Sequence, residues 1–111
     1  KRWAGFREIP WIEGEWAGEA DAATLQNKVK QSMTVNPDIL VTHAPPIGIL
    51  DNEDLCACHV GVSSLTSRLA DQPHNVKLHC FGHIHERAGS VEHMNILFSN
   101  AAQTAHLIEV R

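Results

Sequence analysis

The stretch DILVTHAPP, residues 38–46, decides the fold, because an apolar run breaks off there at a histidine and a pair of prolines. The run from Ile39 to Thr42 is short and apolar, as in a strand buried on both faces of a sheet. A prolyl pair cannot continue a central strand, so His43 is predicted at the carboxyl end of this strand, where the chain enters a loop. A second stretch, VKLHCFGHIHE at residues 76–86, repeats the pattern with an apolar run, a glycine and two histidines.

The remaining elements follow from capping residues, turn residues and periodicity. In chain order we first expect an irregular or weakly extended segment over residues 1–20, a helix capped by Asp21 and running to about Met33, and the strand over 38–42. A helix after Gly61, capped by Ser63 or Ser64 and ending before Pro73, the strand over 76–81 and an antiparallel pair over 95–99 and 105–110 should follow. This order predicts a single α/β domain over residues 1–111, a layered sheet of mixed parallel and antiparallel strands with helices. The strands over 38–42 and 76–81 are expected to be parallel, across a right-handed crossover.

The composition excludes several classes of protein. The chain has 111 residues, of which 43% are hydrophobic and 20% charged, unlike a disordered segment. No apolar run approaches the ~20 residues of a membrane span. The formal charge is −4 and no basic run is present, so general nucleic-acid binding is not expected. Three cysteines are an odd number, which argues against a disulfide framework and indicates a cytoplasmic location.

Eight histidines in a chain of this length raise the question of metal binding, since imidazole is the commonest metal ligand. His43 and the pair His83 and His85 are predicted at the carboxyl ends of neighbouring strands, where ligands of open α/β sheets bind. In an extended His-x-His, both imidazoles point to the same side. The three histidines together are therefore the candidate metal ligands, whereas any one of them alone would more often be structural.

The motifs also resemble those of a known family. The segments that carry the resemblance are VTHAPP at 41–46, GILD at 48–51, VG at 60–61, LHCFGHIHE at 78–86 and FSNA at 98–101. They are similar to the C-terminal half of a calcineurin-like metallophosphoesterase, of the branch typified by metallophosphoesterase domain-containing proteins. The resemblance covers residue 38 to the end, with the Gly-His-x-His-Glu segment as its most specific part. It implies half of an αββα sandwich, with residues 38–111 carrying the motifs.

The resemblance implies a site with two divalent metal ions, Mn, Fe or Zn, that hydrolyses phosphoester substrates. His43 and His83 correspond to ligands of one metal, and His85 to a ligand of the other. The family's Asp-x-His, Gly-Asp and Gly-Asn-His-Glu segments, which supply the bridging carboxylate and the proton donor, do not occur in this chain. We therefore expect a half-site in which three imidazoles hold at most one ion weakly and no catalytic residue is identified. The partner would be the missing N-terminal half, or a second copy bound through an exposed sheet edge.

Other residues remain as secondary candidates. Glu86 could orient an imidazole through its second nitrogen, or simply be solvated. His79 is predicted to be a core histidine or a support for the ligands, and His59 a surface residue or a phosphate contact. A zinc site from Cys56, Cys58 and Cys80 is the weaker interpretation of the cysteines, because the C-x2-C spacing of structural zinc is missing. The alternative function is a non-catalytic, histidine-rich metal-binding or interaction module that retains the fold.

Overall fold

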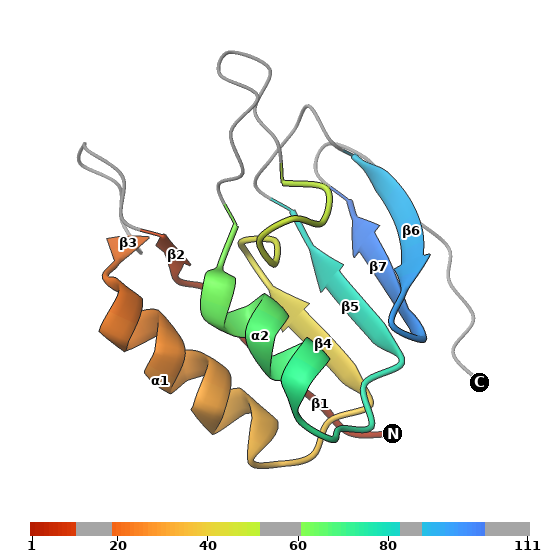
Figure 1. Ribbon diagram of the computed structural model, residues 1–111, viewed down its shortest axis with the longest axis horizontal. Helices are drawn as coiled ribbons and strands as arrows, with labels where there is room; N and C mark the ends of the chain where they lie inside the picture. Colours follow the sequence, from red (N-terminus) through yellow and green to blue (C-terminus); the bar gives the residue numbers. More distant parts are fainter. Residues whose placement is uncertain (11–18, 52–60, 83–87, 102–111) are drawn as a thin grey trace.

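A computed structural model of the chain describes residues 1–10, 19–51, 61–82 and 88–101 (Figure 1). Its elements are β1 (Trp3–Phe6), β2 (Ile9–Pro10), β3 (Glu19–Ala20), α1 (Ala22–Met33), β4 (Ile39–Thr42), α2 (Ser63–Asp71), β5 (Leu78–Phe81), β6 (Gly89–His93) and β7 (Ile96–Asn100). Five strands form one sheet in the order β1-β4-β5-β7-β6, while β2 and β3 pair separately. The first four strands of the sheet are parallel, and β6 is antiparallel to β7. The predicted α/β fold with a mixed sheet is confirmed.

The helix α1 begins and ends where the sequence predicts. Asp21 Oδ1 accepts a hydrogen bond of 2.8 Å from the Thr24 N–H, which satisfies a donor that the start of a helix leaves unpaired. The hydrogen bonds from Thr24 also hold the pKa of Asp21 below its usual value. Beyond the last turn, Asn36 has a φ of 51° and is followed by Pro37, which ends the helical run. The buried stripe includes the three predicted residues, Leu25, Val29 and Met33.

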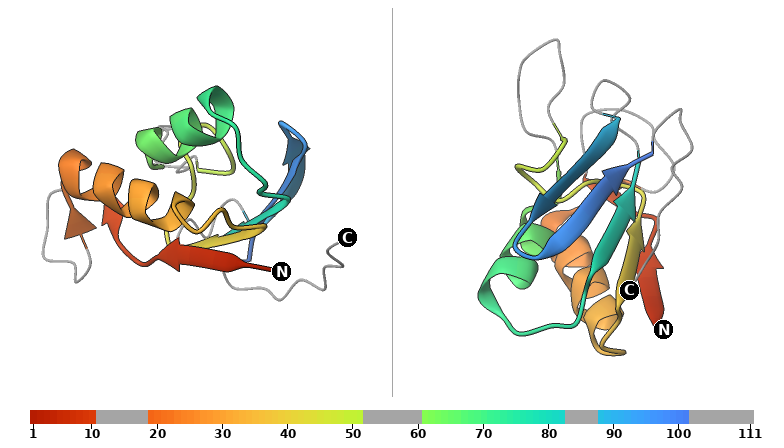
Figure 2. Two further views of the ribbon diagram at one scale, coloured as in Figure 1. Left: turned by 90° about the horizontal axis from the view of Figure 1, so that it is seen from below. Right: turned by 90° about the vertical axis from the view of Figure 1, so that its right-hand side faces the viewer.

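The two helices lie on the same side of the sheet, as Figure 2 shows. On that side Leu40, His79 and Phe98 are paired across β4, β5 and β7, and each is 0% exposed. Successive side chains of a strand point to opposite faces, and among the described residues no helix covers the other face. We call it the open face and define it by the exposed or half-buried residues Trp3, Ile39, Val41, Cys80 and Leu97, although Leu78 and Ser99 on the same face are buried.

The open face corrects the prediction for residues 38–42. Val41 is 43% exposed, so β4 is buried on one face only. The apolar run gave no sign of this, because Ile39 and Val41 are as apolar as the buried Leu40 between them. Continuous apolar strands predict two covered faces, but the described helices cover one.

The segment predicted to be irregular or weakly extended is extended at residues 3–6, and only the irregular alternative is wrong there. These residues form β1, which pairs in parallel with β4 at the edge of the sheet, with Gly5 opposite Val41. A Cβ on Gly5 would lie 1.7 Å from the Val41 carbonyl oxygen, so glycine is needed for the two strands to approach. The strand was missed because it has only four residues and its alanine and glycine give no apolar alternation.

The helix α2 buries Val62, Leu65 and Leu69 as predicted, but neither serine caps it. Its N-cap is Val62, whose side chain makes no capping hydrogen bond. The main chain explains the position, because the Val62 N–H donates to Pro45 O at 2.8 Å and Val62 O accepts from the Ile47 N–H at 3.2 Å. Val62 is therefore held in an extended bridge beside the turn after β4, and the helix starts directly behind it.

The tail also differs from the prediction. The strand β7 (Ile96–Asn100) lies between β5 and β6, and residues 105–110, its expected antiparallel partner, lie outside the described residues. Its antiparallel partner is β6, a mostly polar and exposed edge strand without the apolar pattern of a buried strand. Met94 and Asn95 join the two with φ of 53° and 59°, as a tight two-residue hairpin requires. Neither described helix is long and apolar enough to span a membrane.

Candidate functional site

The four parallel strands end at one edge of the sheet, at the top of Figure 1. The residues that directly follow them are, in order across the sheet, Arg7, His43, Gly82 and Ala101. We call these four residues the carboxyl row. Ligands of open α/β sheets bind beyond the carboxyl ends of the strands, so this row is where a binding site is expected.

Backbone hydrogen bonds continue the sheet into the carboxyl row. The His43 N–H donates to Phe6 O at 3.2 Å, and the Gly82 N–H donates to His43 O at 3.1 Å. The side chain of His43 is exposed. Because His83 follows Gly82 in the sequence, the chain runs from the immediate neighbour of His43 into the histidine pair.

A buried hydrogen-bond network supports the turn that carries His43. The Thr42 hydroxyl donates to Ala44 O at 2.6 Å, and Thr42 Oγ1 lies 2.9 Å from His79 Nε2. A hydroxyl has one proton and a carbonyl oxygen only accepts, so Thr42 cannot also donate to His79. His79 therefore carries its proton on Nε2 and donates it to Thr42. The network fixes the residues on either side of His43.

His79 is a core residue with one nitrogen left over. Its ring packs against Phe81 and Phe98, with ring centroids 5.0 Å and 5.6 Å away. Burial lowers the pKa of His79 from 6.5 to about 3, because the charged form is denied water. Nδ1 is buried and has no hydrogen-bond partner among the described residues. The neutral ring thus acts on the site through Thr42.

A second group of buried polar residues lies beside the carboxyl row. Asp51 is fully buried, and its Oδ2 accepts a hydrogen bond of 3.0 Å from the Gly61 N–H. Asn100 at the end of β7 is also fully buried and donates from Nδ2 to Leu50 O at 3.3 Å. Residues 51 and 61 flank the segment 52–60, so these contacts fix where that segment leaves and rejoins the fold.

The structure describes only part of the predicted site. His43 and His79 lie where they were predicted, at the end of β4 and inside β5. The other predicted site residues lie outside the described residues: His59, His83, His85 and Glu86. Within residues 1–10, 19–51, 61–82 and 88–101, no group of three or more His, Cys, Asp or Glu side chains is close enough to hold a metal.

The predicted cysteine site is described at one position only. Cys80 is a free thiol on the open face, and burial raises its pKa. Cys56 and Cys58 lie outside the described residues, so the zinc interpretation stays a prediction. A raised pKa disfavours the thiolate, which is the form that binds zinc.

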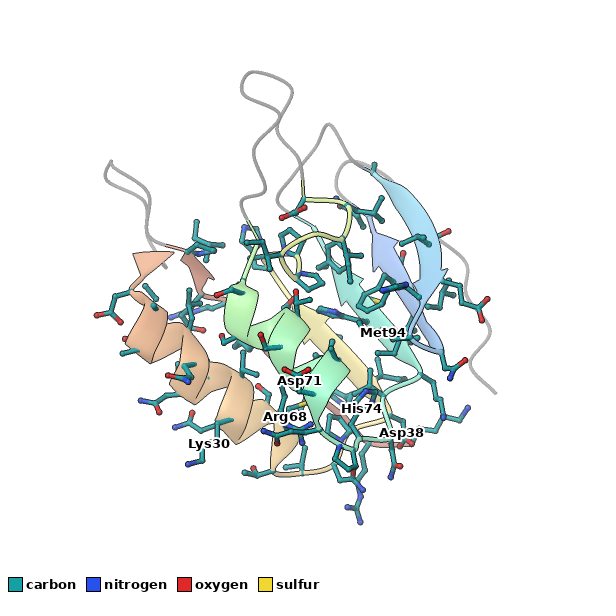
Figure 3. All side chains as sticks on the ribbon, viewed as in Figure 1. Lys30, Asp38, Arg68, Asp71, His74 and Met94 are labelled. Atoms are coloured by element: carbon teal, nitrogen blue, oxygen red, sulfur yellow. The ribbon has the colours of Figure 1, made fainter. Side chains whose placement is uncertain are left out.

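A groove of about 970 Å³ lies between α1 and α2, and none of the four carboxyl-row residues lines it. Val29 and Met33 line it together with charged residues of both signs. Figure 3 labels three of these, Lys30 on α1 and Arg68 and Asp71 on α2. Neither His43 nor His79 is among its lining residues, so we place the candidate site at the carboxyl row.

Two residues of the site were missed in the sequence. The apolar run predicts Thr42 only as the end of a strand, although a hydroxyl before a predicted ligand is a candidate for holding the following turn. Arg7 falls in the segment predicted to be irregular or weakly extended, and its position beside His43 depends on the pairing of β1 with β4. No pattern in the first ten residues indicated that pairing.

Comparisons with known proteins show a distant relative and a similar fold. No protein-family model matches the chain. UPF0046 protein K07C11.7 of Caenorhabditis elegans is 37% identical over 68 residues, which cover 60% of this chain and 21% of that protein. A crystal structure aligns with 90% of this chain and 40% of its own chain, with a TM-score of 0.61 and 18% identity. The chain therefore spans about a fifth of the relative's length and two fifths of that structure, whose likeness concerns the fold alone.

Proposed function

We propose that this chain forms the C-terminal half of a two-metal phosphoesterase site, which hydrolyses a phosphomonoester or phosphodiester together with a second half. The observation that supports the proposal most is the hydrogen bond between Gly82 N–H and His43 O. It places the residue before His83 beside His43, at the carboxyl edge of a parallel sheet. Metal-ligand residues that follow neighbouring strands in this way can converge on one ion.

His43, the one predicted metal ligand within the described residues, is a suitable donor for a divalent metal. His43 is exposed at the carboxyl row, and imidazole suits Zn, Fe and related ions. When bound, two such ions would activate a water molecule and neutralise phosphoryl oxygens. The chain's own contribution is to position His43, through its backbone bonds to Phe6 and Gly82 and through the Thr42 and His79 network.

The proposal covers half of a site because the ligand set is incomplete. Two neighbouring dications need carboxylates to bridge them and balance their charge. Asp51, the one fully buried carboxylate among the described residues, accepts a hydrogen bond from the Gly61 N–H, just before α2. The remaining ligands would come from the part of the relatives that this chain does not span. The isolated chain should bind one ion weakly and turn over little substrate.

Metal titration of the chain tests the ligand assignment. With Mn²⁺ or Co²⁺ in calorimetry, His43→Ala and His83→Ala should each weaken binding at least about tenfold, the scale of losing one coordinating group. The matched control is His93→Ala, which removes an exposed imidazole from β6 and should leave binding unchanged. Equal effects at positions 43 and 93 would contradict the assignment.

Activity separates the phosphoesterase from the non-catalytic alternative. With Mn²⁺ and a chromogenic phosphodiester, the isolated chain should show little turnover, and the full-length protein that contains it should be active. Strong turnover by the isolated chain that His83→Ala abolishes would contradict the half-site. Metal binding without turnover in the full-length protein would support the binding module.

A further inference from the structure

We propose that Arg7 binds the phosphoryl oxygens of the ligand beside His43. This inference rests on the proposed function and extends it to a residue that no motif identifies. It starts from the carboxyl row, in which Arg7 and His43 follow the adjacent strands β1 and β4.

The register places the two residues at adjacent positions beyond the ends of β1 and β4. Phe6 pairs with Thr42 in the parallel β1-β4 ladder, and the His43 N–H donates to Phe6 O at 3.2 Å. Arg7 and His43 are each one residue further along. Neighbouring strands lie about 4.8 Å apart, so both residues project from adjacent positions at the same edge. Both are exposed, which leaves them accessible to a dissolved ligand.

Arg7 brings positive charge to this edge. Among the described cations, Arg2 and Lys77 precede β1 and β5. They therefore lie at the amino ends of the strands, opposite the carboxyl row. The guanidinium of Arg2 donates to Val35 O at 3.3 Å. That of Arg7 has no hydrogen bond or ion pair with the described part of the chain. Its neighbour Glu8 is paired with Lys28, at 3.4 Å, and does not neutralise it.

The chemistry of guanidinium indicates the class of ligand. Its planar donors match two oxygens of a phosphate group and remain charged at every physiological pH. A cation beside a metal ligand repels the metal and attracts a phosphate dianion, so the two effects of Arg7 have opposite signs. A residue that only supported the fold would change both affinities in the same direction.

The test uses the chain loaded with Mn²⁺ and titrated with inorganic phosphate. Arg7→Gln should weaken phosphate binding about tenfold, while Mn²⁺ affinity stays equal or rises a few-fold. Arg7→Lys keeps the positive charge but loses the planar pair of N–H donors. Its phosphate affinity should lie between the affinities of Arg7→Gln and the unchanged chain. Lys77→Gln is the matched control, because it removes one exposed charge at the opposite edge and should leave both affinities unchanged.

The outcomes separate this inference from the function it rests on. Absence of Mn²⁺ binding to the unchanged chain would overturn the proposed function and the role of Arg7 with it. Normal Mn²⁺ binding with no phosphate binding, or with equal phosphate affinity in Arg7→Gln, would overturn the role of Arg7 alone. Equal losses in Arg7→Gln and Lys77→Gln would also overturn it, because they would indicate general charge attraction. A loss confined to position 7 supports it.

Discussion

At the scale of the residue, His79 links the core of the fold to the candidate site. Its ring is fully buried, and its pKa lies near 3 instead of 6.5 because of that burial. The unfolded chain therefore binds a proton below pH 6.5 that the folded chain does not bind until about pH 3. Stability falls as the pH drops from about 6.5, and above that pH the residue contributes no pH dependence.

His79→Gln should remove this pH dependence while keeping an N–H that can donate to Thr42. From pH 7 to pH 5, the unfolding free energy of the unchanged chain should fall by about 2 kcal/mol because of His79. The variant should not show this decrease. Urea unfolding at pH 7, 6 and 5 measures the difference. Parallel pH curves for the two chains would show that His79 is not buried in its neutral form.

Thr42 should matter for its hydroxyl more than for its shape. Thr42→Val keeps the volume but leaves the His79 Nε2–H and Ala44 O without their partner, which should cost about 1–3 kcal/mol of stability. Thr42→Ser keeps the hydroxyl and should cost clearly less. Thermal unfolding of both variants measures the two losses. A Thr42→Val variant more stable than Thr42→Ser would contradict the network.

At the scale of the element, β1 depends on one glycine. A Cβ on Gly5 would meet the Val41 carbonyl oxygen, and backbone atoms cannot move aside as a flexible side chain can. Gly5→Ala should therefore destabilise the chain by about 1–3 kcal/mol, and amide exchange at residues 3–6 should speed up most. Gly82→Ala is the control, because no atom of the described residues lies within 4 Å of its Cβ position. Unchanged exchange in β1 of Gly5→Ala would contradict the observed register.

The elements also show what the sequence could and could not predict. The helix α1 and the strands β4 and β5 were predicted because each carries a local signal, such as the Asp21 cap or the prolines after His43. The strand β1 and the edge strand β6 carry none, since their pairing depends on residues far away in the chain. The same limit applies to the site, where His43 was predicted from its turn but Arg7 became its neighbour only through the β1-β4 pairing.

At the scale of the whole molecule, the described helices cover one side of a five-stranded sheet (Figure 2). On the open face, Trp3 is 72% exposed and Val41 43% exposed. Exposed large apolar side chains of this kind are found at interaction sites, and within the described part of the chain β1 forms one edge of the sheet next to them. The chain spans about two fifths of the crystal structure it resembles. We therefore expect the open face, together with the β1 edge, to bind a further part of the protein or a second copy.

Charge on the open face tests this expectation in the isolated chain. Val41→Lys places a charge on the open face, where burial of an unpaired ammonium is costly, so it should reduce concentration-dependent self-association in sedimentation experiments. Val35→Lys is the matched control, because Val35 is 45% exposed between α1 and β4 and lies outside the open face. If the unchanged chain is still monomeric at about 100 μM, it forms no dimer with a micromolar Kd. Self-association through the open face is then excluded. If both variants reduce it equally, the contact depends on net charge and not on the open face.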